Sequence, residues 1–260
     1  MLIGILGEAG SGKDAVCFNL VKDHRFYSLA LADPMKVYCQ WMFGWPSMML
    51  WGSSERRAEL DEQFFFNKCP TCGRHEGIRD PDGLGPTATW RVCAFCKTAT
   101  PLEQLKTPVS PRYTLQNLGD WARGFRADAY VAFVLKRAQA VLGHRPCDDP
   151  LWRSLQQAAM TGYRWFGYED DGVGRVVISD VRMTNEVAGI RNAGGKVYRV
   201  KRDQVALDQA RATLAPGIPN HVSEVQQRNI PDDALDGVIN NDGTLEDLKQ
   251  AVTALIHGQE

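Results

Sequence analysis

A glycine-rich stretch near the start of the chain has the residue types and spacing of a phosphate-binding loop. Its sequence, Gly7-Glu8-Ala9-Gly10-Ser11-Gly12-Lys13, fits the pattern G-x-x-x-x-G-K. In this pattern backbone N–H groups surround the phosphates of a nucleotide, and the lysine reaches the β- and γ-phosphates. A helix that begins near Lys13 would add the positive end of its dipole. We therefore expect the residues that bind ATP to be Gly10, Ser11, Gly12, Lys13 and Asp14.

The residue after the lysine departs from the general pattern. Asp14 stands where a serine or threonine hydroxyl normally contacts Mg²⁺. A carboxylate can also hold this ion, directly or through a water molecule. Asp14 therefore remains compatible with an Mg²⁺-dependent nucleotide site. The alternative is a glycine-rich turn between a strand and a helix that binds no ligand.

Four of the seven cysteines form two Cys-x-x-Cys pairs. Cys69 and Cys72 make the first pair, Cys93 and Cys96 make the second, and this spacing is typical of a four-thiolate zinc site. Four thiolates leave no open coordination position, so we expect a structural zinc whose binding supplies folding energy. An iron–sulfur cluster and two redox-active dithiols are the alternatives.

The composition is that of an ordinary soluble protein, because 44% of the 260 residues are hydrophobic and 23% are charged. The net charge of -1 lacks the basic excess of most nucleic-acid-binding proteins, so we expect no nucleic-acid partner. The sequence contains no apolar run of membrane-spanning length and no signal-peptide pattern at its start. We therefore expect a cytoplasmic location and no membrane partner.

Apolar strands that alternate with helical segments should position these residues. This alternation predicts an α/β fold with a doubly wound, mainly parallel sheet of the kind found in P-loop NTPases and nucleoside monophosphate kinases. Met35, Tyr38, Met42 and Phe43 form a stripe that we interpret as core packing. The expected strands cover residues 2–6, 27–32, 175–178, 196–200 and 238–240, and the expected helices begin at residues 13, 34, 113, 128, 151, 186 and 245.

Between residues 67 and about 111 the composition changes to proline, glycine, cysteine and threonine without a helical period. We interpret residues 67–98 as an inserted zinc-ribbon-like module. Residues 1–66 and 99–260 would then form the P-loop kinase domain. The module could act as a lid, as a pocket wall or as an element that binds a partner.

Six segments, taken in order, resemble the deoxynucleoside monophosphate kinases of tailed bacteriophages. The resemblance covers most of the chain outside residues 67–98, and it includes the unusual Asp14. The segments are Ser11-Gly12-Lys13-Asp14, Leu31-Ala32-Asp33-Pro34-Met35-Lys36, Pro111-Arg112-Tyr113-Thr114-Leu115-Gln116-Asn117-Leu118-Gly119, Ser179-Asp180-Val181-Arg182 with Glu186, His221-Val222-Ser223-Glu224, and Asn241-Asp242-Gly243-Thr244-Leu245-Glu246.

The resemblance implies Mg²⁺-dependent transfer of the γ-phosphoryl group of ATP to a small-molecule acceptor, a deoxynucleoside monophosphate, in support of phage DNA synthesis in the host cytoplasm. It also hints at a homodimer. One alternative is a P-loop kinase with another acceptor, such as a hydroxymethylated base in DNA or a cofactor precursor. Another is a nucleotide-binding module in which the zinc ribbon binds a partner.

Phosphoryl transfer depends on positioning and on charge neutralisation, so two anionic substrates require cations beyond Lys13. Lys36 follows a strand end and could meet the acceptor phosphate. Arg112 and Arg123 could bind the acceptor or the transition state in a two-pronged fashion. Gln116 could hydrogen-bond a base edge. For each of the four, an ordinary exposed side chain on a helix is the alternative.

Asp180 and Arg182 follow the strand expected at 175–178, at the edge of the sheet where ligands gather. Asp180 could orient Mg²⁺ or its waters, or bind the acceptor sugar, and Arg182 could hold a phosphate. An ion pair at the surface is the alternative. Glu186 could serve only as a local cap, and the pair Arg56-Arg57 could lie on the acceptor side or on an exposed face. The expected catalytic residues are Lys13, Asp14, Asp180 and Arg182.

Overall fold

The computed structural model describes residues 1–74, 77–79, 89–144, 173–212 and 222–258. The expected helix that starts at residue 151 lies outside these residues. The elements are β1 (Leu2–Leu6), α1 (Lys13–His24), β2 (Tyr27–Leu29), α2 (Asp33–Phe43), α3 (Ser47–Trp51), α4 (Ser54–Ala58), β3 (Asp61–Asn67), β4 (Ile78–Arg79), β5 (Trp90–Cys93), β6 (Ala99–Pro101), α5 (Leu102–Leu105), β7 (Lys106–Val109), α6 (Pro111–Phe125), α7 (Ala129–Leu142), β8 (Val176–Val181), α9 (Thr184–Asn192), β9 (Lys196–Lys201), α10 (Gln204–Ala212), α11 (Val222–Asn229), η3 (Asp232–Ala234), β10 (Gly237–Asn240) and α12 (Leu245–His257).

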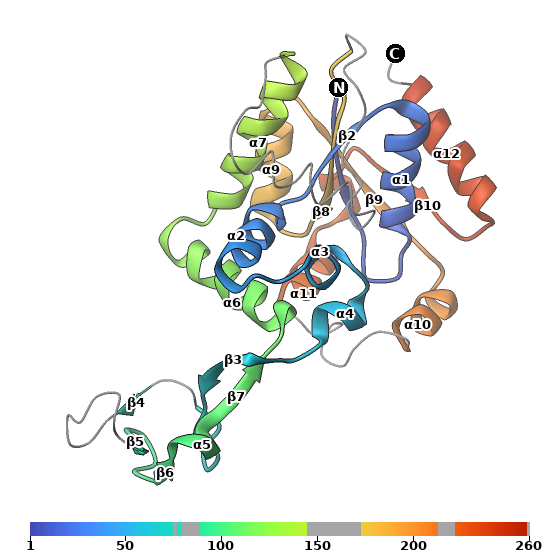
Figure 1. The fold of residues 1–260 in the computed structure, drawn as a ribbon. Coiled ribbons are helices and arrows are strands. Elements are labelled where there is room, and N and C mark those ends of the chain that lie inside the picture. The colour runs from blue at the N-terminus through green and yellow to red at the C-terminus, as the bar shows by residue number, and fades with distance from the viewer. Residues whose placement is uncertain (75–76, 80–88, 145–172, 213–221, 259–260) are drawn as a thin grey trace.

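A five-stranded sheet forms the centre of the molecule, as Figure 1 shows. Its strand order is β10-β9-β1-β8-β2, and every neighbouring pair is parallel. All five residues of β1 are buried, which is typical of a parallel strand covered on both faces. The sequence prediction of an α/β fold with a parallel sheet is confirmed. Because the strands are parallel, their carboxyl ends meet at one edge.

Helices cover both faces of this sheet (Figure 1). On one face α7 and α9 pack against β1 and β8 through an apolar cluster that includes Val131, Val187 and Ile190. On the other face α1 and α12 pack through a cluster that includes Leu20 and Val252. Helix α12 begins at the predicted capping box, in which Thr244 and Asp247 bond to each other's backbone N–H groups. The sheet edge that carries the P-loop is thus held between two apolar cores.

An arm that contains the four cysteines projects from this body (Figure 1). It starts as an antiparallel ribbon of β3 and β7 and continues into a small sheet of order β4-β5-β6. Phe64 and Phe66 of β3 pack against the buried Trp45 and Val109 at its root. Trp45 Nε1 also donates a hydrogen bond of 2.6 Å to Asp61. The paired strands β3 and β7 therefore lie before and after residues 67–98 in the sequence, and they form the base of the arm.

Two local predictions are wrong. Tyr38 and Met42 are 46% and 56% exposed, so these two residues of the stripe on α2 are not core packing, whereas Phe43 packs against the apolar cluster at the root of the arm. The buried residues of α2 are instead Asp33, Val37 and Cys39. The pattern failed because Asp33, a polar residue, is buried through its hydrogen bonds.

The other wrong prediction concerns β2, which ends at Leu29 instead of residue 32. The N–H groups of Leu31 and Ala32 bond to the Asp180 side chain and not to a neighbouring strand. A short helix, α5, also occurs in the region where no helical period is visible. Among the described residues, no helix combines the length and the apolar character needed to cross a bilayer.

Candidate functional site

The predicted phosphate-binding loop joins the buried strand β1 to helix α1. Gly10 and Gly12 have φ values of +88° and +95°, in the left-handed region that glycine adopts most readily. The loop is also closely packed, because a Cβ atom on Gly10 would lie 2.8 Å from the Cβ of Ala210 in α10. The glycines are therefore required both by the backbone conformation and by the space around it.

One side chain inside this loop is polar and buried without a partner. Ser11 is 1% exposed, and its Oγ forms no hydrogen bond with any described residue. The Ser11 N–H donates a bond of 3.0 Å to the Glu8 carbonyl, which closes the turn. A buried hydroxyl without a partner is uncommon in folded proteins. The loop conformation and this hydroxyl fit a site for an anionic ligand, and Lys13 begins the helix beside it.

Asp180 lies at the carboxyl end of β8, as the sequence predicts. Its Oδ1 accepts a hydrogen bond of 2.6 Å from the Leu31 N–H, and its Oδ2 accepts one of 3.1 Å from the Ala32 N–H. The carboxylate therefore holds the turn between β2 and α2. Carboxylate oxygens can accept more than one bond, so a further contact to Mg²⁺ or to a sugar remains a prediction.

This turn leads to a small buried network at the start of α2. Asp33 is 2% exposed and accepts bonds of 3.0 Å from the Ala30 N–H and from Trp51 Nε1. Lys36 follows one turn later, and its Nζ lies 5.6 Å from the centroid of the Trp51 ring. A cation at this distance is attracted to the face of the ring. Lys36 is thus held near the turn that Asp180 organises.

Arg57 of α4 lies on the side of the predicted phosphate-binding loop, whereas the sequence named the pair Arg56-Arg57 without separating its two members. Electrostatic interactions link its guanidinium to Asp14 and to Arg182. Burial lowers the pKa of Arg57, the Asp14 carboxylate opposes this shift, and Arg182 adds to it. Its Nε is buried and has no hydrogen-bond partner among the described residues. Arg57 and Arg182 therefore lie on the same side of the site as the Asp14 carboxylate.

The neighbouring Arg56 points elsewhere, which explains why the sequence could not select Arg57. Arg56 forms an exposed ion pair of 2.7 Å with Glu59 on its own helix. Adjacent helical residues face different directions, so one of two neighbouring arginines reaches the site. The sequence could separate the two arginines only if it showed which face of α4 packs against the body. A helix of five residues is too short for its apolar periodicity to show this.

Glu186 of α9 supports the segment that carries Arg182. It is 9% exposed, and its Oε2 accepts bonds of 2.6 Å from the Arg182 N–H and 2.9 Å from the Met183 N–H. Burial raises the pKa of Glu186 to about 7, although these N–H donors act in the opposite direction. The capping role that the sequence suggests for Glu186 is therefore observed, and it fixes the backbone of Arg182.

The remaining predicted side chains all come from α6. Arg123 forms an ion pair of 2.5 Å with Asp120 one turn away and lies against Gly119. The Arg112 Nε is buried, and Gln116 is half-buried. The structure thus carries these three residues on one helix beside α2. Their contact with an acceptor stays a prediction.

A separate groove of about 620 Å³ lies between α2, α6 and the root of the arm. Aromatic side chains dominate its lining, including Tyr38, Phe65, Tyr113 and Trp121. None of the P-loop residues lines it. The groove accounts for the exposed Tyr38 and Trp121, and it does not include the predicted phosphate-binding loop.

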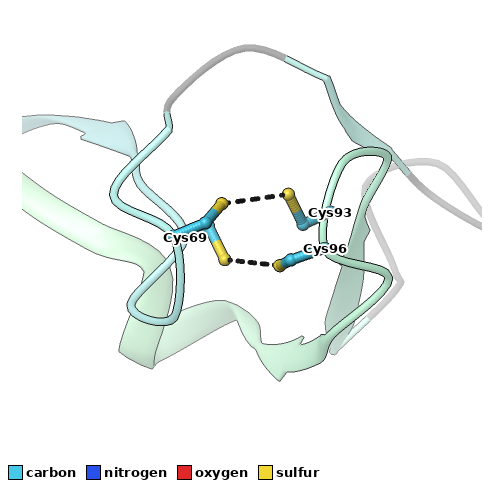
Figure 2. A group of neighbouring side chains, drawn as sticks. Cys69, Cys93 and Cys96 are labelled. Carbon is cyan, nitrogen blue, oxygen red and sulfur yellow. Dashed lines mark hydrogen bonds between the residues drawn. The ribbon is translucent and has the colours of Figure 1, made fainter.

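The arm brings all four predicted metal-ligating cysteines together. Figure 2 shows the sulfurs of Cys69, Cys93 and Cys96 turned toward the same space. The four Sγ atoms lie within 4.8 Å of one another, with separations of 3.5 Å for Cys69–Cys96 and 3.6 Å for Cys72–Cys93. Tetrahedral zinc with Zn–S bonds of about 2.3 Å places its sulfurs about 3.8 Å apart. The cluster is therefore compatible with zinc and too wide for disulfides.

The electrostatic surroundings of Cys93 and Cys96 also favour metal binding. For Cys72, a backbone hydrogen bond from Arg74 lowers the pKa, but desolvation and the neighbouring thiols outweigh it and raise the pKa to about 11. Hydrogen bonds from the Thr98 side chain and backbone lower the pKa of Cys96 to about 6. A backbone hydrogen bond from Cys96 lowers the pKa of Cys93. Thiolates are the form that binds metal ions. The turn after Cys93 thus stabilises two of the four ligands in that form.

Two comparisons with known proteins give matches, and no model of a known protein family matches the chain. A protein of Acanthamoeba polyphaga mimivirus named "Putative deoxynucleotide monophosphate kinase" is 23% identical over 261 residues, which cover 98% of this chain and 96% of that protein. The solved structure of TT1252 from Thermus thermophilus aligns with a TM-score of 0.40 at 15% identity, over 100% of this chain and 98% of that one. The mimiviral relative, distant as it is, supports a kinase-like family for this chain.

Proposed function

We propose that this protein is a kinase that transfers the γ-phosphoryl group of ATP to a deoxynucleoside monophosphate. The P-loop carries the proposal, because its two left-handed glycines and buried Ser11 hydroxyl fit a polyphosphate. The name of the mimiviral relative supports the choice of acceptor. The phage origin and cytoplasmic location implied by the sequence resemblance belong to the proposal as well.

The residues of the loop have separate roles in this proposal. The backbone N–H groups of residues 10–13 bind the phosphates, and Lys13 neutralises charge on the β- and γ-phosphates. Asp14 holds Mg²⁺ directly or through water, and the ion, when bound, screens the phosphate charges. Arg57 and Arg182 bind the phosphate oxygens between donor and acceptor, since electrostatic interactions already link both arginines to this corner.

The acceptor lies on the side of α2 and α6. Lys36 and Arg112 contact its phosphate, Arg123 assists them, and Gln116 meets its base. Asp180 positions this side through the turn that it holds at residues 31 and 32. The kinase domain comprises residues 1–66 and 99–260, and the insert at 67–98 binds one structural zinc ion through its four cysteines.

A panel of acceptors tests the reaction. Purified protein is incubated with ATP, Mg²⁺ and each of the common deoxynucleoside and ribonucleoside monophosphates, and ADP release is measured. We expect release that depends on a deoxynucleoside monophosphate. Transfer to duplex DNA or to a cofactor precursor would instead identify another P-loop kinase. Tight ATP binding without turnover on any acceptor would indicate a nucleotide-binding module.

The substitution Lys13→Ala tests the assigned site. It removes the lysine that neutralises the transferred phosphate, so we expect transfer to fall by about a hundredfold or more. Lys22→Ala is the matched control, because Lys22 is exposed near the other end of the same helix. Undiminished transfer by the Lys13→Ala protein would refute the site.

A further inference from the structure

One side chain from the far end of the chain contacts the P-loop directly. Asn241 follows β10, and its Nδ2 donates a hydrogen bond of 2.9 Å to the carbonyl oxygen of Ser11, 230 residues away. A carbonyl oxygen accepts and cannot donate, so the amide nitrogen must face it. In the sequence, Asn241 begins the turn after the last expected strand and one of the six resembling segments, and neither pattern assigns it a contact with the loop.

The same amide occupies the space that Gly12 leaves open. A Cβ atom on Gly12 would lie 2.2 Å from Asn241 Nδ2 and 3.2 Å from its Cγ. Gly12 also has a φ of +95°. Asn241 therefore lies against the face of Gly12 that a side chain would cover in any other residue. The contact is built into the loop and is not a loose surface bond.

Asn241 is itself firmly placed. Its backbone N–H donates a bond of 2.8 Å to the carbonyl of Lys201, at the end of the neighbouring β9. The next residue, Asp242, accepts a bond of 2.6 Å from the Asp203 N–H. The capping box of α12 follows immediately. Two strand ends and a helix start thus hold the position from which the amide reaches the loop.

The geometry of a peptide group gives this contact a consequence for the loop. In a planar trans peptide, the carbonyl and the following N–H point in opposite directions. A bond that directs the Ser11 carbonyl toward Asn241 therefore turns the Gly12 N–H to the opposite side. The Gly12 N–H is one of the donors that a loop of this sequence offers to phosphates.

We propose that Asn241 is a positioning residue that fixes the peptide between Ser11 and Gly12, so that the Gly12 N–H faces the phosphates of the nucleotide. The inference rests on the proposed function insofar as the loop binds ATP. Asn241 touches no substrate and acts through the backbone of the loop. Reorientation of a single donor-bearing peptide would then weaken nucleotide binding without changing any residue of the loop itself.

The substitution Asn241→Asp tests this role through its pH dependence. A carboxylate has no proton to donate and repels the Ser11 carbonyl, whereas the protonated acid can donate a bond to it. Lowering the pH should therefore restore the contact. The charged side chains around it come from the loop, the start of α1, the segment after β9 and the region around the α12 cap: Glu8, Lys13, Arg202, Asp203, Asp242 and Asp247.

The measurement is the affinity for a non-hydrolysable ATP analogue with Mg²⁺, by calorimetry at about pH 8 and about pH 4.3, where an aspartate with the ordinary pKa of about 3.9 is protonated in a substantial fraction of molecules. We expect the N241D protein to bind about tenfold more weakly than the unmodified protein at the higher pH, and within about threefold of it at the lower pH. Asn240→Asp adds the same charge at the preceding, exposed residue and should change affinity less than about twofold. Asn241→Ala removes the donor without adding charge, so its loss should be the same at both pH values.

The affinities of the two Asn241 variants decide whether Asn241 positions the loop. Equal affinity of the N241D and unmodified proteins at both pH values would overturn it, and so would a loss that ignores pH. If N241D does not fold, as judged by thermal unfolding without ligand, undiminished binding by N241A would still overturn the role. Failure of the unmodified protein to bind the analogue would instead refute the proposed function itself.

Discussion

The predicted P-loop and the cysteine turns of the arm are both short turns that carry a candidate site, yet different forces hold them. The P-loop lies between two apolar clusters that cover both faces of the parallel sheet. Between residues 67 and 105, no described residue belongs to any of the three apolar clusters. The strands of the small sheet there are two to four residues long. The body therefore holds its predicted site by burial, and we expect metal binding to hold the cysteine turns of the arm.

The two sites should therefore depend on their ligands in opposite ways. The left-handed glycines of the P-loop are enforced by packing against Ala210 and Asn241, so the loop keeps its shape without nucleotide. Among the described residues between 67 and 105, only Cys69, Cys93, Thr100 and Leu105 are buried, so the apolar packing around the four thiols is small there. Nucleotide removal should leave the loop folded, and metal removal should unfold the arm.

Metal removal should give the largest effect. Cys69→Ser with Cys72→Ser removes two ligands, so the arm should lose the roughly 10 kcal/mol or more that structural zinc supplies and unfold locally. Metal analysis should fall from about one zinc per chain to none. Hydrogen exchange measured by mass spectrometry should then show lost protection in residues 67–105 and unchanged protection in β1 and α1.

A cysteine of the body serves as the control for this experiment. Cys39 is buried in α2, so Cys39→Ala should leave the metal content unchanged. The contrast fails if the metal-free arm keeps its protection. It also fails if the body loses protection together with the arm, because the two regions would then fold as one unit.

A single methyl group in the P-loop should give the next largest effect. Gly12→Ala forces a side chain into the left-handed region, at a cost of about 1–2 kcal/mol, and drives its Cβ into Asn241. We expect stability to fall by about 2–4 kcal/mol and affinity for ATP to fall at least about tenfold. Chemical denaturation and calorimetry measure the two losses.

Gly44→Ala separates strain from contact. Gly44 also has a positive φ, of +68°, but a Cβ atom there would meet nothing within 4 Å. It should lower stability by about 1 kcal/mol and leave ATP affinity unchanged. Equal effects of the two substitutions would mean that packing around Gly12 does not define the loop.

The parts of the fold that the sequence predicts well depend on local patterns. The apolar run of β1, the glycines of the P-loop and the capping box of α12 each appear within a few neighbouring residues. The spacing of the paired cysteines likewise predicts, without other information, that the four thiols lie together. Such features need no knowledge of the rest of the chain, because local geometry and a single ligand type determine them.

The parts that the sequence predicts poorly depend on contacts between distant residues. Asp180 bonds to the N–H groups at residues 31 and 32, which shortens β2. Asp33 is buried because Trp51 donates to it, so the buried face of α2 differs from the apolar stripe. Arg57 reaches Asp14 only through the packing of α4. The hydrophobic periodicity of the sequence contains no sign of these contacts, because each polar partner taken alone has the pattern of an exposed residue.

Protonation also differs between the two regions. In the arm, hydrogen bonds from Thr98 dominate and lower the pKa of the Cys96 thiol to about 6. In the body, burial dominates and raises the pKa of the Glu186 carboxyl to about 7. The body thus favours the neutral form of its buried acid, while the turn after Cys93 favours the charged form of two thiols, Cys93 and Cys96. Glu186→Gln tests the body's half of this contrast.

The sign of the expected effect follows from linkage. The folded protein holds the proton of Glu186 up to about pH 7, whereas the unfolded chain releases it near the ordinary value of 4.5. Wild-type stability should therefore decrease as the pH rises from about 5 to about 8, by about 1–3 kcal/mol from this group. Glutamine does not ionise, so the substituted protein should lose that slope and gain stability relative to wild type at about pH 8.

Urea denaturation at several pH values measures the slope for both proteins. Glu246→Gln is the matched control, because Glu246 is exposed in the first turn of α12 and its loss should leave the slope unchanged. A glutamine amide oxygen can still accept the bond from the Arg182 N–H, so the cap itself is preserved. Equal slopes for wild type and Glu186→Gln would show that burial does not control this carboxyl, and the proposed electrostatic difference between body and arm would be lost.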